Sequence, residues 1–463
     1  MTYYLAIDIG ASSGRHILGW LEDGQLRTRE VYRFDNNAGV KNGHLCWDID
    51  AIYAALIAGL KRCGETGMIP YSLGIDTWGV DFVLIDSAGS RLGDAVCYRD
   101  SRTDGMDAEI EKIIPYEELY NLTGIAKQPF NTIYQLTALK KESPQLLEKA
   151  ERLLMMPDYL HYLLSGIGSN EYTQASTGAL VDARERNWNR HIINALGFPE
   201  RLFRNLDTAG DGIGLLSKAV EAEAGFSCRI TLPATHDTGS AFLAVPASED
   251  SVYISSGTWS LLGIESMASI ITREAREADF TNEGGFQYRY RFLKNIMGLW
   301  MVQSVRKELG KKQSFNELAQ TAEDTESFST VVDVNNQAFF APQSMIEAVK
   351  EVAAETGQTP PETTGELMQC LYRSLAVSYR DAILNLERIA GKHFSSVNLV
   401  GGGSKDDYLN RLTSRFTGLP VYAGPIEATV AGNLIVQMIS SGELSDLAAA
   451  RRIVAQSFDV KRY

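Results

Sequence analysis

The fold is decided by residues 4–15, which read Tyr4-Leu5-Ala6-Ile7-Asp8-Ile9-Gly10-Ala11-Ser12-Ser13-Gly14-Arg15. An apolar run typical of a buried strand ends in a carboxylate and then in a turn of small residues. Such a turn leaves backbone N–H groups free to bind phosphate oxygens, and the carboxylate can hold Mg²⁺ directly or through water. The alternative is a plain hairpin that binds nothing, although an unpaired carboxylate at a buried strand end is costly.

A second turn of the same kind occurs much later in the chain, in the segment Tyr253-Ile254-Ser255-Ser256-Gly257-Thr258-Trp259-Ser260. Strands begin again at this point, so the second hairpin is the best candidate for a domain boundary. We expect an N-terminal domain over residues 1–245 and a C-terminal domain over residues 246–463. Two hairpins in two halves of one chain predict a nucleotide clamp with two sides.

Composition limits the possible functions. The chain has 463 residues, of which 44% are hydrophobic and 22% charged, which is enough for two or three globular domains. Its net charge of −14 argues against a nucleic acid or an anionic membrane as the main partner, because phosphate backbones select positive surfaces. No apolar run approaches the ~20 residues of a membrane span, and the polar N-terminal residues do not resemble a signal peptide. We expect a cytoplasmic protein.

The cysteines indicate neither zinc nor a disulfide framework. The five cysteines are Cys46, Cys63, Cys97, Cys228 and Cys370. No two of them form a C-x-x-C pair, and no histidine lies at metal-binding spacing from any of them. Their odd number and wide separation favour reduced, mostly buried thiols, while one disulfide remains an open alternative.

Periodicity predicts a mixed sheet covered by helices in the first half. We expect strands over 4–9, 16–21 and 28–34, a helix over 49–63, and strands over 72–76 and 81–85. This order is typical of an α/β fold. The pattern is then helical from about 107 to 165 and stops at Gly166, as helices often do at glycine.

The second half alternates strands and helices. We expect strands over 228–234, 251–256, 259–265 and 396–400, and helices over 294–309, 313–323, 364–390 and 406–416. Gly401-Gly402-Gly403 follows the last strand and is either a ligand-approach site or only a tight turn. The sequence contains neither a P-loop nor a Rossmann glycine motif, so an ATP site would rest on the two hairpins.

Six segments, taken in order, resemble the motifs of the FGGY carbohydrate kinases. They are Ile7-Asp8-Ile9-Gly10-Ala11-Ser12-Ser13-Gly14-Arg15, Gly74-Ile75-Asp76-Thr77-Trp78-Gly79-Val80-Asp81-Phe82, Tyr98-Arg99-Asp100-Ser101-Arg102-Thr103, His236-Asp237-Thr238, Ser255-Ser256-Gly257-Thr258-Trp259-Ser260 and Gly401-Gly402-Gly403. The resemblance covers nearly the whole chain and includes Asn282-Glu283-Gly284-Gly285 and Lys294-Asn295-Ile296-Met297-Gly298-Leu299-Trp300.

This resemblance implies an actin/hexokinase-like fold, in which two similar ribonuclease-H-like α/β domains hold nucleotide and sugar in a cleft between them. It implies ATP and Mg²⁺ as cofactors and a small ketose as the partner, with no nucleic acid and no membrane. The motifs are most similar to those of members that phosphorylate L-rhamnulose on its 1-hydroxyl. A kinase for L-fuculose, L-xylulose or L-ribulose is the nearer alternative, and an actin-like ATPase without a sugar substrate is the remote one. Oligomeric state is left open.

The same resemblance implies a role for individual residues. Asp237 would be the general base that accepts the proton of the attacking hydroxyl, and a helix N-terminus there would favour its ionised form. The expected sugar contacts are Gly79, His236, Asp237, Thr238 and Asn295. The expected ATP contacts are Ala11, Ser12, Ser13, Gly14, Arg15, Thr258, Gln303 and Gly402. Asp8 would hold Mg²⁺ through water.

Simpler readings of several of these residues stay open. Asp237 could be a plain helix cap, and His236 could be a core histidine whose hydrogen bonds are already satisfied. Arg15 could be a surface arginine, and Trp78 could serve only in packing. We expect Asp76 and Asp81, which flank the turn at Trp78, to be strand-end carboxylates with structural partners and no catalytic role.

Overall fold

A computed structural model describes residues 1–245 and 250–463 of the chain. The contacts between residues divide the chain into two compact units. Unit 1 comprises residues 1–244, 265–292 and 429–457, and unit 2 comprises residues 245–264, 293–428 and 458–463. The boundary predicted from the sequence adjoins residues 246–249, which lie outside the described residues, and the division into 1–245 and 246–463 stays a prediction.

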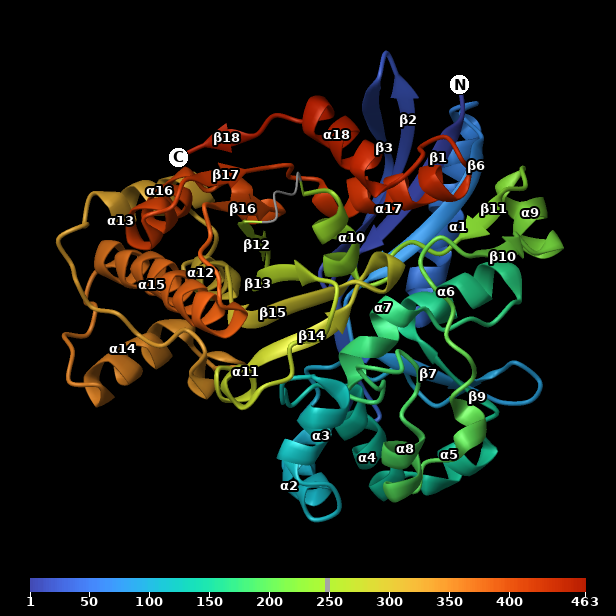
Figure 1. Ribbon diagram of the computed structural model, residues 1–463, viewed down its shortest axis with the longest axis horizontal. Helices are drawn as coiled ribbons and strands as arrows, with labels where there is room; N and C mark the ends of the chain where they lie inside the picture. Colours follow the sequence, from blue (N-terminus) through green and yellow to red (C-terminus); the bar gives the residue numbers. More distant parts are fainter. Residues whose placement is uncertain (246–249) are drawn as a thin grey trace. The chain divides into compact units, whose positions relative to one another are not determined.

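Unit 1 is built on a six-stranded mixed sheet in the order β10-β11-β6-β1-β2-β3 (Figure 1). Its strands are β1 (Tyr3–Ile9), β2 (Ser13–Glu22), β3 (Gln25–Asp35), β6 (Pro70–Thr77), β10 (Gly212–Leu215) and β11 (Arg229–Thr231). The first three strands form an antiparallel meander, whereas β6 runs parallel to β1 and pairs Asp8 with Asp76. The two carboxylates therefore end neighbouring strands on the same edge.

Helix α1 (Ile49–Glu65) contributes to the apolar core beside this sheet. It begins at Asp48, whose side chain accepts a hydrogen bond from Ala51 N, and its fully buried Leu56 and Leu60 belong to the same apolar cluster as Leu5 of β1. A buried leucine contributes about 2 kcal/mol relative to an exposed one, so this face holds the helix to the sheet.

Two helices from the end of the chain also belong to unit 1. These are α17 (Ala428–Ser440) and α18 (Leu447–Ser457), drawn in red beside the blue strands in Figure 1. From α17, Gln437 Nε2 donates to Leu5 O of β1 over 3.0 Å, and Asn433 Nδ2 donates to Gly74 O of β6 over 3.1 Å. The sequence patterns considered above did not identify these helices.

The remaining elements of unit 1 surround this core. The small strands are β4 (Ala38–Lys41), β5 (His44–Trp47), β7 (Phe82–Ile85), β8 (Arg91–Leu92), β9 (Arg152–Met155) and β14 (Phe280–Gly284). The helices are α2 (Met106–Glu111), α3 (Tyr116–Thr123), α4 (Thr132–Glu142), α5 (Pro144–Lys149), α6 (Met156–Ser165), α7 (Tyr172–Ala175), α8 (Arg190–Ala195), α9 (Lys218–Ala224), α10 (Asp237–Leu243) and α11 (Arg273–Glu277).

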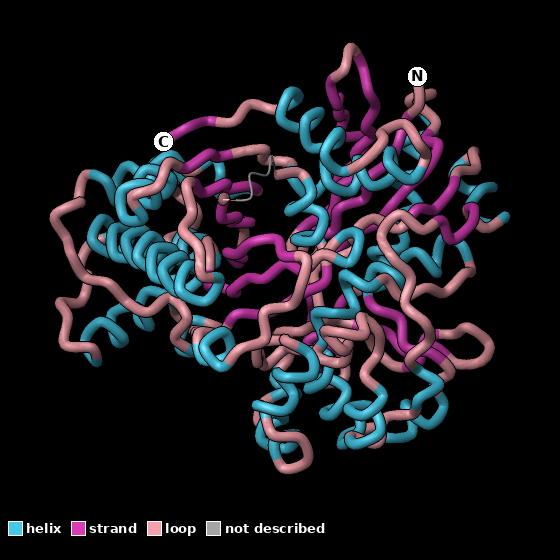
Figure 2. The backbone as a smooth tube through the Cα atoms, in the orientation of Figure 1, coloured by secondary structure: helices cyan, strands magenta, loops and turns pink. Residues whose placement is uncertain are grey.

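Unit 2 contains a sheet in which β13 (Trp259–Ser266), β12 (Ser251–Ser256), β16 (Ser396–Val400), β17 (Val421–Ala423) and β18 (Lys461–Arg462) are successive neighbours. Its helices, in cyan in Figure 2, are α12 (Trp300–Glu308), α13 (Phe315–Glu323), α14 (Met345–Glu355), α15 (Thr364–Ala390) and α16 (Asp407–Thr417). The long α15 starts with a capping box between Thr363 and Glu366 and ends at Gly391 in the left-handed region. Strand β15 (Tyr290–Met297) leads from unit 1 into unit 2.

Most of the predicted elements are confirmed, and one is wrong. Residues 294–297 are the end of strand β15, and the helix predicted from 294 begins only at Trp300. Strand β9 also interrupts the helical pattern predicted over 107–165. All five cysteines are buried and unpaired, which confirms the prediction of reduced thiols. No helix in the described ranges combines the length and apolarity that crossing a membrane requires.

Candidate functional site

The first hairpin holds Asp8 at the end of β1 in contact with Arg15 of β2. The two residues are paired in the antiparallel ladder, and Arg15 Nη2 donates to Asp8 Oδ2 over 2.6 Å. Their side chains are 13% and 19% exposed, so this is a partly buried ion pair. Arg15 is therefore more than a surface arginine, because its guanidinium is fixed beside the carboxylate at the strand end.

The turn between these two residues is held by hydrogen bonds and is partly open to solvent. Gly10 N donates to Ser13 O over 2.9 Å, and Asn36, which directly follows β3, donates hydrogen bonds to Ser12 O and Gly10 O. Ser12 is exposed, and Ala11 and Ser13 are half-buried. Gly14 leaves no room for a side chain, since a Cβ atom there would lie 2.2 Å from the ring of Phe34.

Asp76 lies beside Asp8 and is completely buried. Asn433 Nδ2 donates to Asp76 Oδ2 over 2.6 Å, and Asp76 Oδ1 has no hydrogen-bond partner among the described residues. Burial raises the pKa of Asp76 well above its usual range, and the carboxylates of Asp8 and Asp237 raise it further. These carboxylates form a crowded, acidic strand edge.

Such a donor set suits a hard divalent cation. Mg²⁺ prefers oxygen ligands, keeps several waters and is usually held by one or two carboxylates together with substrate phosphates. Among the described residues, no group of three or more His, Cys, Asp or Glu side chains is arranged to hold a metal ion by itself. The partly buried Asp8 carboxylate and the buried Asp76 Oδ1, which has no hydrogen-bond partner among the described residues, fit a water-bridged ion.

The loop before α10 presents Asp237. Thr77 N at the end of β6 donates to Thr235 O over 2.9 Å, and the buried Glu171 accepts hydrogen bonds from Thr235 N and Oγ1 over 3.1 and 2.9 Å. These bonds fix the loop one residue before His236. Asp237 then begins the helix with 32% of its side chain exposed, and its Oδ1 accepts from Thr238 N and Oγ1 over 2.5 and 3.0 Å.

The pKa of Asp237 is set mainly by its surroundings. Burial raises it, the neighbouring His236 opposes this effect, and Asp8 adds to it. The net pKa is above the usual value, and the expected contribution of the helix N-terminus to the ionised form stays a prediction. A raised pKa makes the carboxylate a better proton acceptor wherever it is still ionised.

His236 lies at the centre of this loop and is buried. Its Nδ1 is 3.1 Å from Arg291 Nη2, and its Nε2 is 3.4 Å from Asp237 Oδ1. Gly79 lies against the same ring, because a Cβ atom there would be 3.3 Å from His236 Nε2. Unit 1 thus brings together four of the predicted sugar contacts: Gly79, His236, Asp237 and Thr238.

Trp78 and Asp81 belong to one buried network, in which Asp81 has the structural partners expected of it. Trp78 is 5% exposed, and its ring centroid lies 4.1 Å from that of Trp47. Asp81 is fully buried and accepts hydrogen bonds from both indole Nε1 atoms and from Gln135 Nε2, over 2.7, 2.8 and 3.0 Å. Burial still outweighs these bonds and raises the pKa of Asp81 to about 6. These hydrogen bonds to Asp81 hold the turn that carries Gly79.

In unit 2, the second hairpin packs against the glycine turn. Leu299 N donates to Gly257 O over 3.0 Å, and Trp300 N donates to Thr258 O over 3.2 Å, so the residues leading into α12 hold the hairpin that contains Thr258. A Cβ atom at Gly403 would lie 2.0 Å from Ser256 Oγ, which permits only glycine at this close approach.

The other predicted residues of unit 2 lie on elements that adjoin this hairpin. Gly402 is exposed, with nothing within 4 Å of the position of a Cβ atom. Gln303 lies on the first turn of α12, where its N–H donates to Leu299 O over 2.8 Å, and Asn295 is half-buried in β15. The predicted residues therefore divide between the units: Thr258, Asn295, Gln303 and Gly402 lie in unit 2, and all the others in unit 1.

Some residues around the unit 1 site were missed from the sequence. Asn433 of α17 reaches Asp76, and Arg291 with Glu283 surrounds His236. One signal was available for the first of these. Asn433 and Gln437 are four residues apart in an otherwise apolar helix, and buried polar residues at helical spacing usually have a polar partner.

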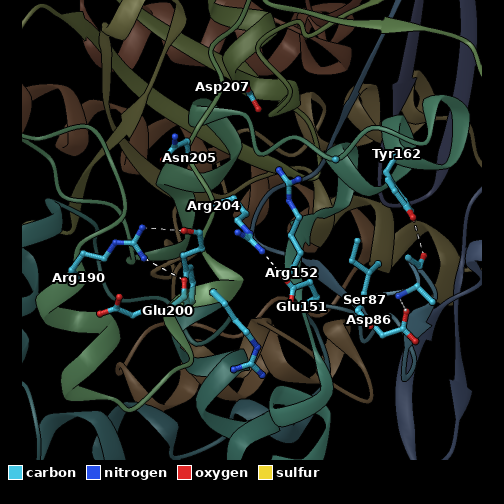
Figure 3. Close-up of a pocket in the computed structure, with 16 residues that line it drawn as sticks. Asp86, Ser87, Glu151, Arg152, Tyr162, Arg190, Glu200, Arg204, Asn205 and Asp207 are labelled. Carbon is cyan, nitrogen blue, oxygen red and sulfur yellow. Dashed lines mark hydrogen bonds and ion pairs between the residues drawn. The ribbon is translucent and has the colours of Figure 1, made fainter.

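A hollow of about 1140 Å³ in unit 1 is a different feature (Figure 3). None of the predicted site residues lines it. Its four arginines, Arg152, Arg190, Arg201 and Arg204, are matched in number by four acids, and Arg204 pairs with Glu151. Arg190 and Arg201 are bonded to backbone carbonyls. This balanced lining does not select an anionic substrate.

Relatives with high similarity cover the entire chain. It is 48% identical over 463 residues to the rhamnulokinase of Halalkalibacterium halodurans, covering 100% of this chain and 99% of the relative. It is 49% identical over 459 residues to the rhamnulokinase of Oceanobacillus iheyensis, covering 99% and 97%, and 42% identical over 460 residues to that of Bacillus subtilis, covering 99% and 94%.

Solved structures share the fold at lower identity. The xylulose kinase of Lactobacillus acidophilus superposes with a TM-score of 0.82 at 15% identity, covering 100% of this chain and 94% of its own. The glycerol kinase of Plasmodium falciparum, solved with ADP, has a TM-score of 0.79 at 14% identity, covering 99% and 94%. The predicted actin/hexokinase-like fold is confirmed. Residues 3–244 match the N-terminal domain and residues 252–441 the C-terminal domain of one family, so the chain belongs to the FGGY family of carbohydrate kinases.

Proposed function

We propose that this chain is an ATP-dependent kinase that transfers the γ-phosphoryl group of ATP to the 1-hydroxyl of L-rhamnulose, giving L-rhamnulose 1-phosphate and ADP. The observation that carries the proposal is identity of up to 49% over essentially the full length with proteins named rhamnulokinase. The acidic strand edge of unit 1 supports it, because phosphoryl transfer needs a positioned base and a cation near the phosphates. The proposed place of action is the cytoplasm.

Asp237 is the proposed general base. It is the only member of the carboxylate group Asp8, Asp76 and Asp237 that lies on the His236–Thr238 loop, and its side chain is partly open to solvent. Two hydrogen bonds from Thr238 hold Oδ1, which leaves Oδ2 to face a sugar hydroxyl. The raised pKa strengthens it as a proton acceptor.

Asp8 is the proposed residue for Mg²⁺, which it would hold through water. When bound, the ion neutralises charge that develops on the phosphates. Arg15 stays beside Asp8 through its 2.6 Å ion pair, so a guanidinium and a carboxylate face the phosphate region together. Backbone N–H groups of the surrounding turn are the proposed phosphate donors, from Ala11, Ser12, Ser13 and Gly14.

The remaining proposed contacts are with the nucleotide and with the sugar. Thr258, Gln303 and Gly402 are the nucleotide contacts, and the exposed, uncrowded Gly402 suits the flat adenosine end. Gly79, His236, Thr238 and Asn295 are the proposed sugar contacts. Leaving one hydroxyl-binding group unpaired costs about 1–3 kcal/mol, which is enough to select one ketose over another.

Two measurements test the proposal. Coupled ADP release over L-rhamnulose, L-fuculose, L-xylulose and L-ribulose should give the highest kcat/KM with L-rhamnulose. Asp237→Asn should keep the fold and ATP binding but lower kcat by roughly 10²–10⁴, the usual worth of a positioned base. Near-normal turnover of this variant would refute the assignment of the base, and preference for another ketose would refute the substrate.

A further inference from the structure

A buried ion pair lies beside the His236–Thr238 loop. Glu283 of β14 and Arg291 of β15 place Oε2 and Nη1 3.0 Å apart, with side chains that are 8% and 1% exposed. Neither of these two atoms makes an aligned hydrogen bond to a described residue, so the pair is held mainly by charge. A buried ion pair generally gives little more stability than an apolar pair of similar volume, so we expect these side chains to have a further role.

Both side chains converge on one nitrogen of His236. Arg291 Nη2 lies 3.1 Å from His236 Nδ1, and Glu283 Oε2 lies 3.3 Å from the same atom. Arg291 Nε donates to Gly284 O over 2.9 Å, which fixes the guanidinium plane. The other ring nitrogen, Nε2, is 3.4 Å from Asp237 Oδ1. The ring thus connects the ion pair to the proposed base.

The chemistry of these groups selects one form of the ring. A guanidinium only donates hydrogen bonds, so Nδ1 accepts from Arg291, while Glu283 Oε2, 3.3 Å away, makes no aligned hydrogen bond that would require a proton on Nδ1. A neutral imidazole that accepts at Nδ1 carries its proton on Nε2, and Nε2 faces Asp237. Glu283 balances the charge of Arg291 next to the ring. Without Glu283, the guanidinium would disfavour a positively charged imidazole.

We propose that Arg291 and Glu283 are positioning residues, which fix His236 as the Nε2–H form so that the ring donates toward the base. This proposal rests on the assignment of Asp237 as the base. It gives a function to the Asn282-Glu283-Gly284-Gly285 segment, and it makes His236 an element of the proton-accepting site as well as a sugar contact.

The charges around Asp237 support this role. Burial acts to raise the pKa of Glu283, but the charge of Arg291 opposes it and the pKa is lowered, so the ion pair is charged at neutral pH. Burial raises the pKa of Asp237, and His236 opposes that effect. Other ionisable groups face this cluster from β1, β6 and the start of α7: Asp8, Asp76, Glu171 and Tyr172.

The direct test is the protonation pattern of the His236 ring. We expect ¹⁵N NMR of histidine-labelled protein, with His236 assigned by its loss in His236→Asn, to show a protonated Nε2 and an unprotonated Nδ1 at neutral pH. In Arg291→Met the Nδ1 atom faces only the Glu283 carboxylate and should gain a proton. A wild-type ring protonated on Nδ1, or an unchanged ring in Arg291→Met, would overturn the proposal.

The second test uses the pH dependence of kcat. Glu283→Gln keeps the shape of the side chain and leaves the positive charge of Arg291 unbalanced, so the acid limb should move to lower pH by about one unit. The control is Glu117→Gln, which removes a mostly exposed carboxylate, distant in the sequence, from its 2.9 Å pair with Arg276. A structural pair alone would lower the melting temperature in Glu283→Gln without moving the acid limb.

The positioning role of Arg291 and Glu283 can fail independently of the assignment of Asp237 as the base. If Asp237→Asn is inactive but the ring form and the acid limb do not respond to Glu283 and Arg291, the positioning role is wrong and the proposed function stands. If Asp237→Asn retains turnover, the base assignment itself is wrong.

Discussion

The packing of α17 against α10 leads to a prediction at Gly432. A Cβ atom at this position would lie 1.8 Å from Ser240 O and 2.5 Å from Ser240 C, both in the backbone of α10. Real Cβ atoms do not approach within 3.0 Å, so in Gly432→Ala the two helices must separate by about 1.2 Å. A backbone carbonyl cannot rotate away as a side chain can, so the strain cannot be relieved locally.

The magnitude follows from two opposing effects. Overpacking costs about 1–3 kcal/mol, with the upper end expected for a clash with backbone. Alanine recovers about 1 kcal/mol as a better helix former than glycine. We expect a net loss of about 2 kcal/mol in the free energy of unfolding of unit 1. Because α10 begins at Asp237, a displacement of about 1 Å should also lower kcat by about 10².

Thermal unfolding followed by circular dichroism, together with steady-state kinetics, measures both effects. The matched control is Gly39→Ala in β4, where nothing lies within 4 Å of the added atom. The control should melt and turn over like the wild type. A Gly432→Ala protein with wild-type melting and wild-type kcat would show that the close approach of α17 and α10 does not hold the base in place.

Three further predictions concern unit 1. Asp8→Ala should weaken Mg²⁺-ATP binding far more than sugar binding in calorimetry, since it removes the carboxylate that Arg15 contacts, and equal losses would contradict a metal-linked role. Gly79→Ala adds an atom 3.3 Å from His236 Nε2 and should raise KM for the ketose while leaving KM for ATP unchanged, as measured by ADP release. The pKa of Asp81 rises from 3.8 to about 6 on folding. Its contribution to the free energy of unfolding is therefore complete below pH 3.8, and about 3 kcal/mol of it is lost as the pH rises through 6. Denaturant unfolding from pH 4 to 7 should show this slope in the wild type and its loss in Asp81→Asn, and an unchanged slope would contradict it.

Much of the fold was predictable because its signals are local. Strands β1 to β3, helix α1 and the long α15 follow from alternation, helical periodicity and caps that lie within a few residues of one another. The error at 294–297 has the same origin. Leu293, Ile296 and Met297 have helical spacing, yet they belong to a strand that is buried on both faces, and short apolar runs do not distinguish the two.

The sequence by itself determined that Asp8 ends a buried strand before a side-chain-poor turn, and that Asp237 begins a helix, because each arrangement is set by its immediate neighbours. Only the tertiary structure decided which groups surround them. Asn433 reaches Asp76 across 357 positions of the chain, and Arg291 reaches His236 across 55. Such contacts arise when separate elements share one core, and burial there sets the charge of Asp76 and Asp237, which no local pattern in the sequence encodes.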